Sequence, residues 1–331
     1  MSKYITKSIK FEYNKGPCKN ILLCGDKDYI KHVGITLTSV CLNTDSNAWS
    51  FHIFLDDLYS DDYKKLYETA KFFKVNITIY FINTEILNKF SKDMHGNDHI
   101  SIACYFRFVA FGALENIVDS VLYLDSDICV VDNKICDFWD IDLYDKIAIV
   151  VGKPPKDPTE IRLGVQQAFN SGVIFVDILK WNKFKLTPIC ISKACERVWP
   201  FLDQDVLNIV LNGKFLSVSK RYNYEYSLSY LIDNEDVPSK ATFAINEATV
   251  IHYIGASKPW HTWVQCCDAT KIYLSIKDKS FWNDTPLFNP DTIKKQTYKY
   301  WHKAARVARK EGFYFDMIKF YIKYIVKKVR R

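Results

Sequence analysis

The chain has 331 residues and a formal net charge of +7, but its charge is unevenly distributed. Residues 291–331 carry 13 Lys and Arg against 3 Asp and Glu, so the body that precedes them is mildly acidic. This distribution argues against an enzyme of nucleic acids, because such a protein places positive charge around its site.

The first half of the chain predicts alternating strands and helices. Ile21–Cys24 and Phe51–Leu55 are apolar runs of strand length, and 75–81 alternates apolar and polar residues. Helical spacing of apolar residues follows each of the first two strands, and a further helix is expected over 101–114 before the strand Val121–Leu124. These short connections indicate an α/β fold with a mostly parallel sheet and helices on both faces.

The second half predicts shorter strands with irregular connections. The apolar runs that suggest them are 147–151, 172–176, 215–218 and 249–253. Residues 153–167 are polar and contain several prolines, which suits a loop over a cleft. Because no clean linker separates the halves, we expect one domain over 18–290, with its nucleotide-binding half up to about residue 150 and its sugar half from about residue 151. Residues 1–17 are expected to form an N-terminal extension.

Two carboxylates follow the strand Val121–Leu124. Asp125 and Asp127 stand two residues apart, so on extended backbone they project to the same side, at the strand end where ligands collect in α/β sheets. Adjacent carboxylates repel unless a cation or a proton relieves them, and hard divalent cations prefer oxygen ligands. The pattern indicates a metal that binds a substrate's phosphates, although a lone Asp-x-Asp is more often only a polar turn.

Two segments of the second half offer polar groups for a sugar. In Phe169–Gly172, Asn170 can both donate and accept hydrogen bonds, and the glycine allows a ligand to approach the backbone. Leu202–Asp205 opens a helix, where Asp203 would line the site on one interpretation and serve only as an N-cap on the other.

A third segment begins at the end of a strand, with His252. This histidine would complete a metal site with the two carboxylates, or it would be a structural group that is satisfied in the core. Gly255 and Lys258 suit a loop that closes a cation over phosphates, and Trp260 offers an apolar face to a sugar ring.

Together these segments resemble glycosyltransferase family 8, and most closely its bacterial lipopolysaccharide outer-core glucosyl- and galactosyltransferases. The resemblance rests on six motifs in the family's order: Gly25-Asp26, Tyr105-Phe106-Arg107, Leu124-Asp125-Ser126-Asp127, Asn170-Ser171-Gly172, Asp203-Gln204-Asp205 and His252-x-x-Gly255-x-x-Lys258-Pro259-Trp260. It implies a single GT-A-type domain that uses a UDP-hexose and a divalent metal. It also implies transfer of glucose or galactose, with retention and therefore in α linkage, to a hydroxyl of the lipopolysaccharide core.

The resemblance also implies a role for each matching residue. The ligands of Mn²⁺ or Mg²⁺ would be Asp125, Asp127 and His252. The groups that act on the sugar would be Arg107, Asn170, Asp203, Gln204 and Asp205, with Gln204 nearest the anomeric carbon. The UDP-sugar would contact Gly25, Asp26, Lys27, Asp28, Tyr29, Ile30, Asp125, Ser126, His252, Gly255, Ser257 and Lys258.

Retention leaves two chemical routes. A double displacement uses a carboxylate nucleophile, but the aligned residue is Gln204, which is a poor nucleophile. Attack from the face of the leaving group, with a phosphate oxygen of the donor taking the proton, is therefore favoured, and Asp205 is kept as the less favoured covalent candidate. Closure over the donor is expected from residues 92–100 and 254–259, because it would exclude water.

Two other functions stay open. A nucleotidyltransferase that makes nucleotide sugars would also need acidic metal ligands, but its triphosphate loop should be rich in Gly and basic residues. The acidic turn around Asp26 and Asp28 does not fit that loop. A noncatalytic, membrane-docked sugar-binding protein would need the basic tail without an intact metal site.

The tail, residues 291–331, predicts a helix that lies on a membrane. Lys319, Lys323, Lys327 and Arg330 recur at helical spacing, and apolar and aromatic residues fill much of the remainder. Such a helix is drawn to anionic lipid, although an ordinary terminal helix with a solvated charged face would look similar. The ten Cys form no Cys-x-x-Cys pair, and no apolar run has the length of a leader or a span, so we expect a cytoplasmic protein bound peripherally to the inner face of the bacterial inner membrane.

Overall fold

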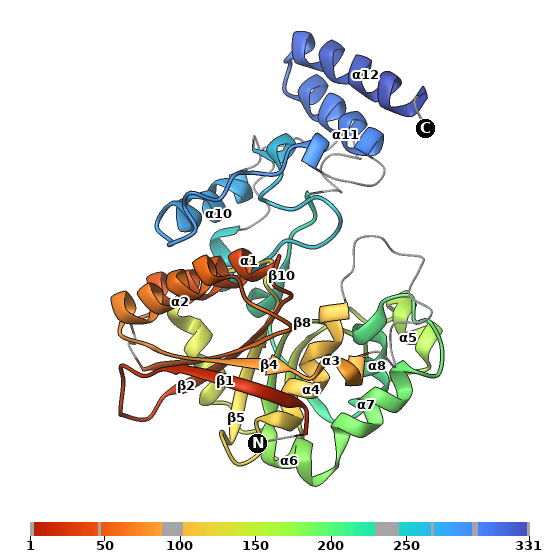
Figure 1. The fold of residues 1–331 in the computed structure, drawn as a ribbon. Helices are drawn as coiled ribbons and strands as arrows, with labels where there is room; N and C mark the ends of the chain where they lie inside the picture. Colours follow the sequence, from red (N-terminus) through yellow and green to blue (C-terminus); the bar gives the residue numbers. More distant parts are fainter. Residues whose placement is uncertain are drawn as a thin grey trace.

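The computed structural model describes residues 3–45, 48–87, 102–228, 245–265, 268–292 and 297–329. Its centre is an eight-stranded sheet with the strand order β1-β4-β3-β2-β5-β8-β7-β9 (Figure 1). The strands are β1 (Ile5–Phe11), β2 (Lys19–Cys24), β3 (Trp49–Leu55), β4 (Asn76–Ile82), β5 (Ser120–Leu124), β7 (Ala148–Gly152), β8 (Phe169–Asp177) and β9 (Phe215–Ser217).

The pairing is mostly parallel, as the alternation of elements predicts. β2 runs parallel to β3 and β5, β3 to β4, and β7 to β9, whereas β1 and β8 run antiparallel to their neighbours. The structure adds Ile5–Phe11, which the sequence analysis set apart in an N-terminal extension, to the edge of this sheet beside β4. An edge strand needs only a few apolar anchors, here the buried Ile5 and Phe11, and lysines on its open side discourage further pairing.

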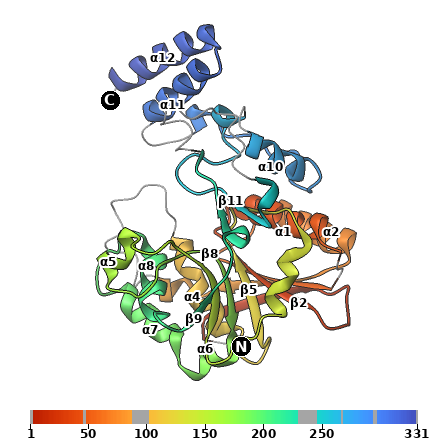
Figure 2. The same ribbon diagram turned by 180° about the vertical axis from the view of Figure 1, so that it is seen from behind.

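Helices cover both faces of the sheet (Figure 1, Figure 2). One face carries α1 (Ile30–Asn43) and α2 (Ser60–Phe73), and the other carries α4 (Phe106–Ala113), α6 (Ile178–Lys183), α7 (Leu186–Ala194) and α8 (Leu202–Val210). Consecutive residues of β2 alternate between the two cores: Leu23 packs beneath α1 and α2, whereas Leu22 packs with α4. A strand that is buried on both faces needs apolar residues on both, which explains the continuous apolar runs.

A small second sheet, with the order β10-β11-β6, extends from the main one. Its strands are β6 (Ile128–Val130), β10 (Tyr224–Glu225) and β11 (Val250–His252). The segment 153–167, expected as a loop, contains the short helix α5 (Pro158–Leu163), whose first turn is capped by Asp157. The remaining short helices are α3 (Thr84–Leu87) and the 3₁₀ turns η1 (Ile102–Tyr105), η2 (Asn133–Trp139), η3 (Lys220–Asn223), η4 (Ile245–Glu247), η5 (Thr262–Val264) and η6 (Pro290–Thr292).

Three helices complete the chain: α10 (Asp268–Asp278), α11 (Thr297–Lys310) and α12 (Tyr314–Val329). α10 packs beside α1, and α11 and α12 form a helical hairpin that stands away from the sheet (Figure 1). The hairpin is fixed to the body through Tyr300, whose ring lies 5.3 Å from that of Trp263. Within the described ranges, no helix combines the length and apolarity needed to cross a membrane.

Candidate metal and sugar-nucleotide site

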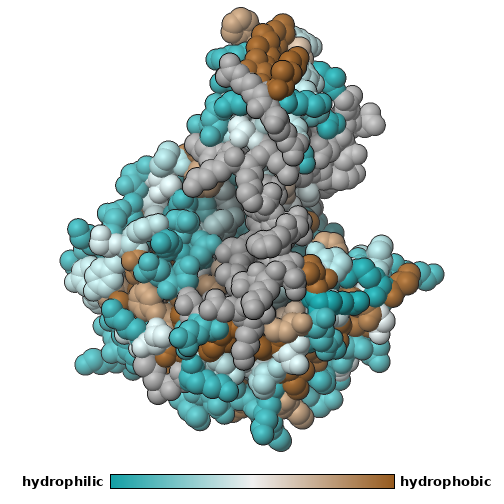
Figure 3. All heavy atoms as spheres, turned by 45° about the vertical axis from the view of Figure 1, so that its right-hand side comes forward, coloured by the Kyte–Doolittle hydropathy of each residue, from teal (hydrophilic) through white to brown (hydrophobic). Residues whose placement is uncertain are grey.

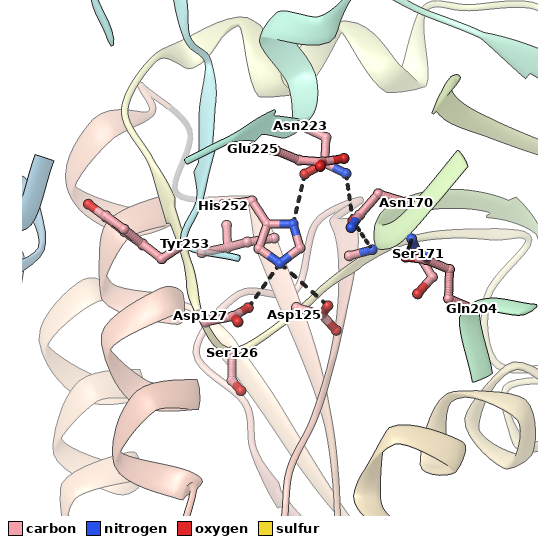
Figure 4. A network of polar contacts seen from close by, with 12 residues as sticks. Asp125, Ser126, Asp127, Asn170, Ser171, Gln204, Asn223, Glu225, His252 and Tyr253 are labelled. Carbon is pink, nitrogen blue, oxygen red and sulfur yellow. Dashed lines mark hydrogen bonds and ion pairs between the residues drawn. The ribbon is translucent and has the colours of Figure 1, made fainter. Parts of the chain in front are cut away.

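The pairing of β6 with β11 explains how residues far apart in sequence meet. Asp127 immediately precedes β6, and His252 ends β11, where it lies opposite Ile128 in the antiparallel register. Asp125 follows β5, and its backbone N–H donates to the Gly172 carbonyl at 2.8 Å. One ligand atom from each of Asp125, Asp127 and His252 lies within 4.8 Å of the other two (Figure 4).

Asp125 presents one oxygen to the protein and the other to the site. Its Oδ1 accepts hydrogen bonds from Arg107 Nη2 at 2.8 Å and from the Tyr123 hydroxyl at 2.5 Å. Its Oδ2 lies 3.7 Å from His252 Nε2. The carboxylate is therefore held in one orientation before any ligand binds, which lowers the entropic cost of binding a cation.

Asp127 is ionised in this environment. Burial opposes its ionisation, but Lys258 and His252 outweigh that effect and hold the pKa of the carboxyl well below its usual range. Its Oδ2 lies 2.5 Å from Lys258 Nζ. Its Oδ1 is buried, makes no other hydrogen bond within the described residues and lies 3.2 Å from His252 Nε2, which can donate to it only while that nitrogen carries a proton. A buried acceptor without a donor is costly, and a bound cation would satisfy it.

His252 is buried between these carboxylates. Burial lowers its pKa, but Asp127 and Asp125 raise it by more, so protonation of His252 would offset the acidic charge when no metal is bound. Two carboxylates and an imidazole form a donor set that suits Mn²⁺ or Mg²⁺. The residues therefore fit the divalent cation that the sequence predicts.

Gly172 lets β8 pass next to the three ligands. A Cβ at this position would lie 2.2 Å from His252 Cε1 and 2.9 Å from Asp125 Oδ2. Both distances are shorter than real contacts of a Cβ, and both partners are held by hydrogen bonds. The glycine is therefore required by the approach of the backbone to the site.

We expect Gly172→Ala to lower Mn²⁺ affinity by about 10-fold or more, because the methyl group must displace the His252 ring. Isothermal titration of the metal-free protein with Mn²⁺ measures this change. Gly16→Ala is the matched control, since its Cβ would meet no atom closer than 3.4 Å. Unchanged affinity in Gly172→Ala would show that the ligands can move aside, and would contradict the close packing described here.

Arg107 connects the metal ligands to the residues expected around the sugar. Its Nη1 donates to the Ser171 carbonyl at 2.7 Å, and its Nε lies 3.2 Å from Asp203 Oδ2. The guanidinium also stacks over the Tyr123 ring, 4.3 Å from its centroid. Burial raises the pKa of Asp203 to about 6, although Arg107 opposes the change. Asp203 thus faces the buried arginine and is not the N-cap of α8, a position that Phe201 occupies without a side-chain capping hydrogen bond.

Asn170 and Gln204 meet across the start of β8. The backbone N–H of Ser171 donates to Gln204 Oε1 at 3.3 Å, and the Ser171 hydroxyl donates to Asp203 at 3.3 Å. Figure 4 shows Asn170, Ser171 and Gln204 near one another. These contacts bring Asn170, Asp203 and Gln204, the residues expected around the sugar, together on the Arg107 side of Asp125.

Asp205 is engaged differently from its neighbours. Its fully buried carboxylate accepts hydrogen bonds from Arg162 Nη1 at 2.6 Å and Nη2 at 2.8 Å, and from the Phe201 backbone N–H at 3.2 Å. A carboxylate with both oxygens bound in a bidentate pair with arginine is not available as a nucleophile. The structure therefore gives Asp205 the role of tying α5 to α8, and we do not retain it as a covalent candidate.

The Gly25–Ile30 turn lies at the carboxyl end of β2, beside β5. Asp26 Oδ1 accepts the backbone N–H groups of Asp28 at 3.1 Å and Tyr29 at 2.9 Å, which shapes the turn. Lys27 Nζ lies 3.8 Å from Asp57. Burial raises the pKa of the Tyr29 hydroxyl, and the charges of Asp127, Asp26 and Asp125 add to the rise. The helix α1, which follows the turn, contacts the Asp-x-Asp segment, because the Thr36 hydroxyl donates to the Ser126 carbonyl at 3.1 Å.

In the loop after β11, the structure suits the expectation for Gly255 but not the one for Trp260. Gly255 has a φ of +87°, a backbone conformation that suits glycine. Trp260, expected to face a sugar ring, is instead buried and stacks on His32 with ring centroids 3.6 Å apart. Ser257 is buried as well, 3.4 Å from Trp263 Nε1. The Trp260 ring is therefore part of the core and does not present a face to a sugar.

Two residues of the candidate site were not predicted from the sequence. Tyr123 could have been found, because it stands two residues before Asp125 and therefore on the same side of the strand. Asn223, whose Oδ1 lies 2.9 Å from His252 Nδ1, follows no motif and carried no such signal.

The chain matches known proteins over most of its length. It matches the family model Glycosyl transferase family 8 over residues 20–264 and the model Glycosyl transferase family 8 C-terminal over residues 269–328. It is 31% identical over 280 residues to lipopolysaccharide 1,2-glucosyltransferase of Escherichia coli K12, which covers 82% of this chain and 81% of that protein. It is also 31% identical over 324 residues to lipopolysaccharide 1,3-galactosyltransferase of Salmonella typhimurium, which covers 94% of this chain and 91% of that protein.

A solved structure supports the architecture. The galactosyltransferase LgtC, in complex with donor and acceptor sugar analogues, has a TM-score of 0.64 against this chain at 22% sequence identity. The match covers 79% of this chain and 96% of LgtC. At this identity the likeness concerns the fold, and it confirms the GT-A-type α/β fold predicted from the motifs.

Proposed function

Because the chain belongs to glycosyltransferase family 8, we propose that it is a metal-dependent, retaining hexosyltransferase that uses UDP-glucose or UDP-galactose. One observation carries this proposal: Asp125, Asp127 and His252 converge at the carboxyl end of β5, and Lys258 lies beside them. The transferase domain would span 18–290, with its nucleotide half up to about 150 and its sugar half after that.

The leaving group of such a transfer is UDP, on which negative charge develops as the sugar–phosphate bond breaks. Mn²⁺ or Mg²⁺ held by Asp125, Asp127 and His252 would stabilise that charge. Lys258 would add a second positive charge, because its Nζ already lies at this position, 2.7 Å from the Tyr253 carbonyl. The turn Gly25–Ile30 would hold the uridine, and Ser126, Gly255 and Ser257 would complete the diphosphate side.

The other side of the site would bind and orient the hexose. Asn170, Asp203 and Gln204 would contact its hydroxyls, and Arg107 would keep Asp203 and Asp125 in place. An amide such as Gln204 is a poor nucleophile, and Asp205 is bound to Arg162. Attack of the acceptor from the leaving-group face, with a donor phosphate oxygen taking its proton, is therefore the route to an α linkage that these residues support.

We infer the acceptor class from the relatives, which are named for transfer to lipopolysaccharide. A hydroxyl of the lipopolysaccharide core would be the acceptor, and no nucleic acid would be a partner. Because that core is anchored in lipid, the enzyme would act at the inner face of the bacterial inner membrane. Residues 291–331 would be the membrane-associating tail.

α12 has the surface that this role requires. One of its faces exposes five large apolar side chains at alternating intervals of three and four residues: Phe315, Ile318, Ile322, Ile325 and Val329. Figure 1 shows α12 at the end of the molecule that stands away from the sheet, and Figure 3 shows apolar surface at that end. A long apolar face on a basic helix is typical of one that lies in a membrane interface.

Two basic residues of α12 are paired with groups of η6 and α11. Lys327 lies 3.2 Å and Lys323 lies 3.9 Å from Asp291, and Lys323 also stands 4.0 Å above the Trp301 ring. Lys319 is exposed beside the apolar face, whereas Arg330 lies outside the described residues. The apolar face, more than the row of lysines expected from the sequence, would therefore contact lipid.

Incubation with UDP-glucose or UDP-galactose tests the proposed reaction. We expect release of UDP that is stimulated by Mn²⁺ and lost after chelation, because the leaving group needs the bound cation. Release of pyrophosphate from a nucleoside triphosphate and a sugar phosphate would instead support a nucleotidyltransferase. Sugar binding without release of UDP would support a noncatalytic sugar-binding protein.

Closure over the donor remains part of the proposal. Residues 254–259 contain Gly255 and Lys258 and would order around UDP, while the other expected segment, 92–100, lies outside the described residues. Closure would limit hydrolysis of the donor by excluding water.

A further inference from the structure

A buried amide holds His252 from the side opposite the carboxylates. Asn223, at the end of η3, has its Oδ1 2.9 Å from His252 Nδ1. Its Nδ2 donates to Asn170 Oδ1 at 3.0 Å, and the backbone N–H of Gly172 donates to the same oxygen at 2.9 Å. These contacts link the expected metal ligand to the expected sugar ligand in a single chain of hydrogen bonds (Figure 4).

The backbone sets the direction of this chain. The N–H of Gly172 can only donate, so the Asn170 atom that faces it is the carbonyl oxygen. That oxygen also faces Asn223, which must therefore turn its NH₂ group toward Asn170 and its own oxygen toward His252. An oxygen opposite Nδ1 requires that Nδ1 carries the proton of the neutral ring.

We propose that Asn223 is a positioning residue that fixes the tautomer of His252 and the amide orientation of Asn170 at once. With the proton on Nδ1, the Nε2 lone pair points at Asp125 and Asp127, where a cation would bind. Because Asn170 Oδ1 already accepts hydrogen bonds from Gly172 and Asn223, the NH₂ group of Asn170 is the part that can donate to a ligand oxygen. This inference rests on the proposed metal-dependent function, and Asn223 would act through its hydrogen bonds to His252 and Asn170 and not as a ligand itself.

Two substitutions separate the roles of the amide. Asn223→Ala removes the acceptor for Nδ1–H, and the loss of such a partner typically lowers metal affinity by about 10–100-fold. Asn223→Asp keeps an acceptor for Nδ1–H, and a carboxylate behind a metal-bound histidine is a common arrangement. Asp lacks the NH₂ group that orients Asn170, so it should retain metal affinity while raising KM for the UDP-sugar.

Long-range ¹H–¹⁵N spectra of the histidine rings in the metal-free protein give a readout that is independent of activity. In the neutral ring, His252 should have its proton on Nδ1 in the wild type and in Asn223→Asp, and should lose that preference in Asn223→Ala. His252→Gln assigns the signal among the seven histidines. At a pH where the wild-type ring is neutral, a proton on Nε2 instead of Nδ1 would overturn the proposal, whatever the activity.

Mn²⁺ titration followed by electron paramagnetic resonance completes the test. Asn223→Ala should bind Mn²⁺ about 10–100-fold more weakly than the wild type, and Asn223→Asp should bind it within a few-fold. Asn43→Ala is the control, because Asn43 donates to the carbonyls of Ser39 and Val130, away from the site. Wild-type affinity in Asn223→Ala would overturn this inference alone, whereas a wild type that binds no Mn²⁺ would overturn the proposed function itself.

Discussion

Asp127→Asn is expected to abolish metal-dependent transfer, lowering kcat by about 10³-fold or more, which corresponds to about 4 kcal/mol. The substitution keeps the size of the side chain but removes the charge that faces both Lys258 and His252. It also replaces a carboxylate oxygen, one that makes no hydrogen bond within the described residues apart from its contact with His252, by an amide that binds a cation poorly. Release of UDP from the UDP-hexose under saturating Mn²⁺ measures the effect.

His252→Ala should have a comparable effect, because it removes the third ligand. Asp284→Asn is the control, since Asp284 pairs with Lys65 at 2.8 Å on the surface. The circular dichroism of all variants should match the wild type, because neither Asp127 nor His252 anchors the core. Near-normal transfer by Asp127→Asn or by His252→Ala would refute the metal assignment.

The double variant Ile318→Glu with Ile322→Glu should lose binding to anionic lipid vesicles by about 100-fold or more, since burying each isoleucine contributes about 1.5–3 kcal/mol. Both side chains are more than half exposed on α12, so the folded state should tolerate the change. Sedimentation with vesicles that contain phosphatidylglycerol measures the binding.

This variant is a sharper test than deletion of the tail. α11 buries Tyr300 and Trp301, and Tyr300 packs on Trp263 of the body, so removal of everything after Pro290 would expose aromatic surface. Ile161→Glu is the matched control, because Ile161 is 80% exposed on α5 and lies outside the tail. Equal sedimentation of the double variant and the wild type would exclude this face of α12 as the anchor, and UDP binding should be the same in both.

The strands and the two carboxylates of the candidate metal site could be predicted from the sequence because each follows from a local rule. Buried strands such as β2 and β5 need apolar residues on both faces, and an Asp-x-Asp at a strand end projects both carboxylates to one side. His252 was joined to them across 125 residues by resemblance to a family. The pairing of β6 with β11 gives the physical reason.

The features of the site that the sequence did not predict depend on packing between distant segments, which no local pattern indicates. Asn223 reaches His252 because η3 leads into β10, which pairs with β11. Asp205 follows Gln204 directly, but the helical turn of α8 directs it toward Arg162. The sequence offers Trp260, close to Lys258, as an apolar face for a sugar ring, but in the structure this ring stacks on His32. In each case, neighbours from distant segments determine what the side chain can do.

The most direct test of the central claim is a titration of the metal-free protein with Mn²⁺ in the presence of UDP, followed by electron paramagnetic resonance. We predict that the wild type binds one Mn²⁺ per chain at Asp125, Asp127 and His252, and that Asp127→Asn loses this binding. Equal binding by both proteins, or no binding by the wild type, would contradict a metal site formed by these three residues.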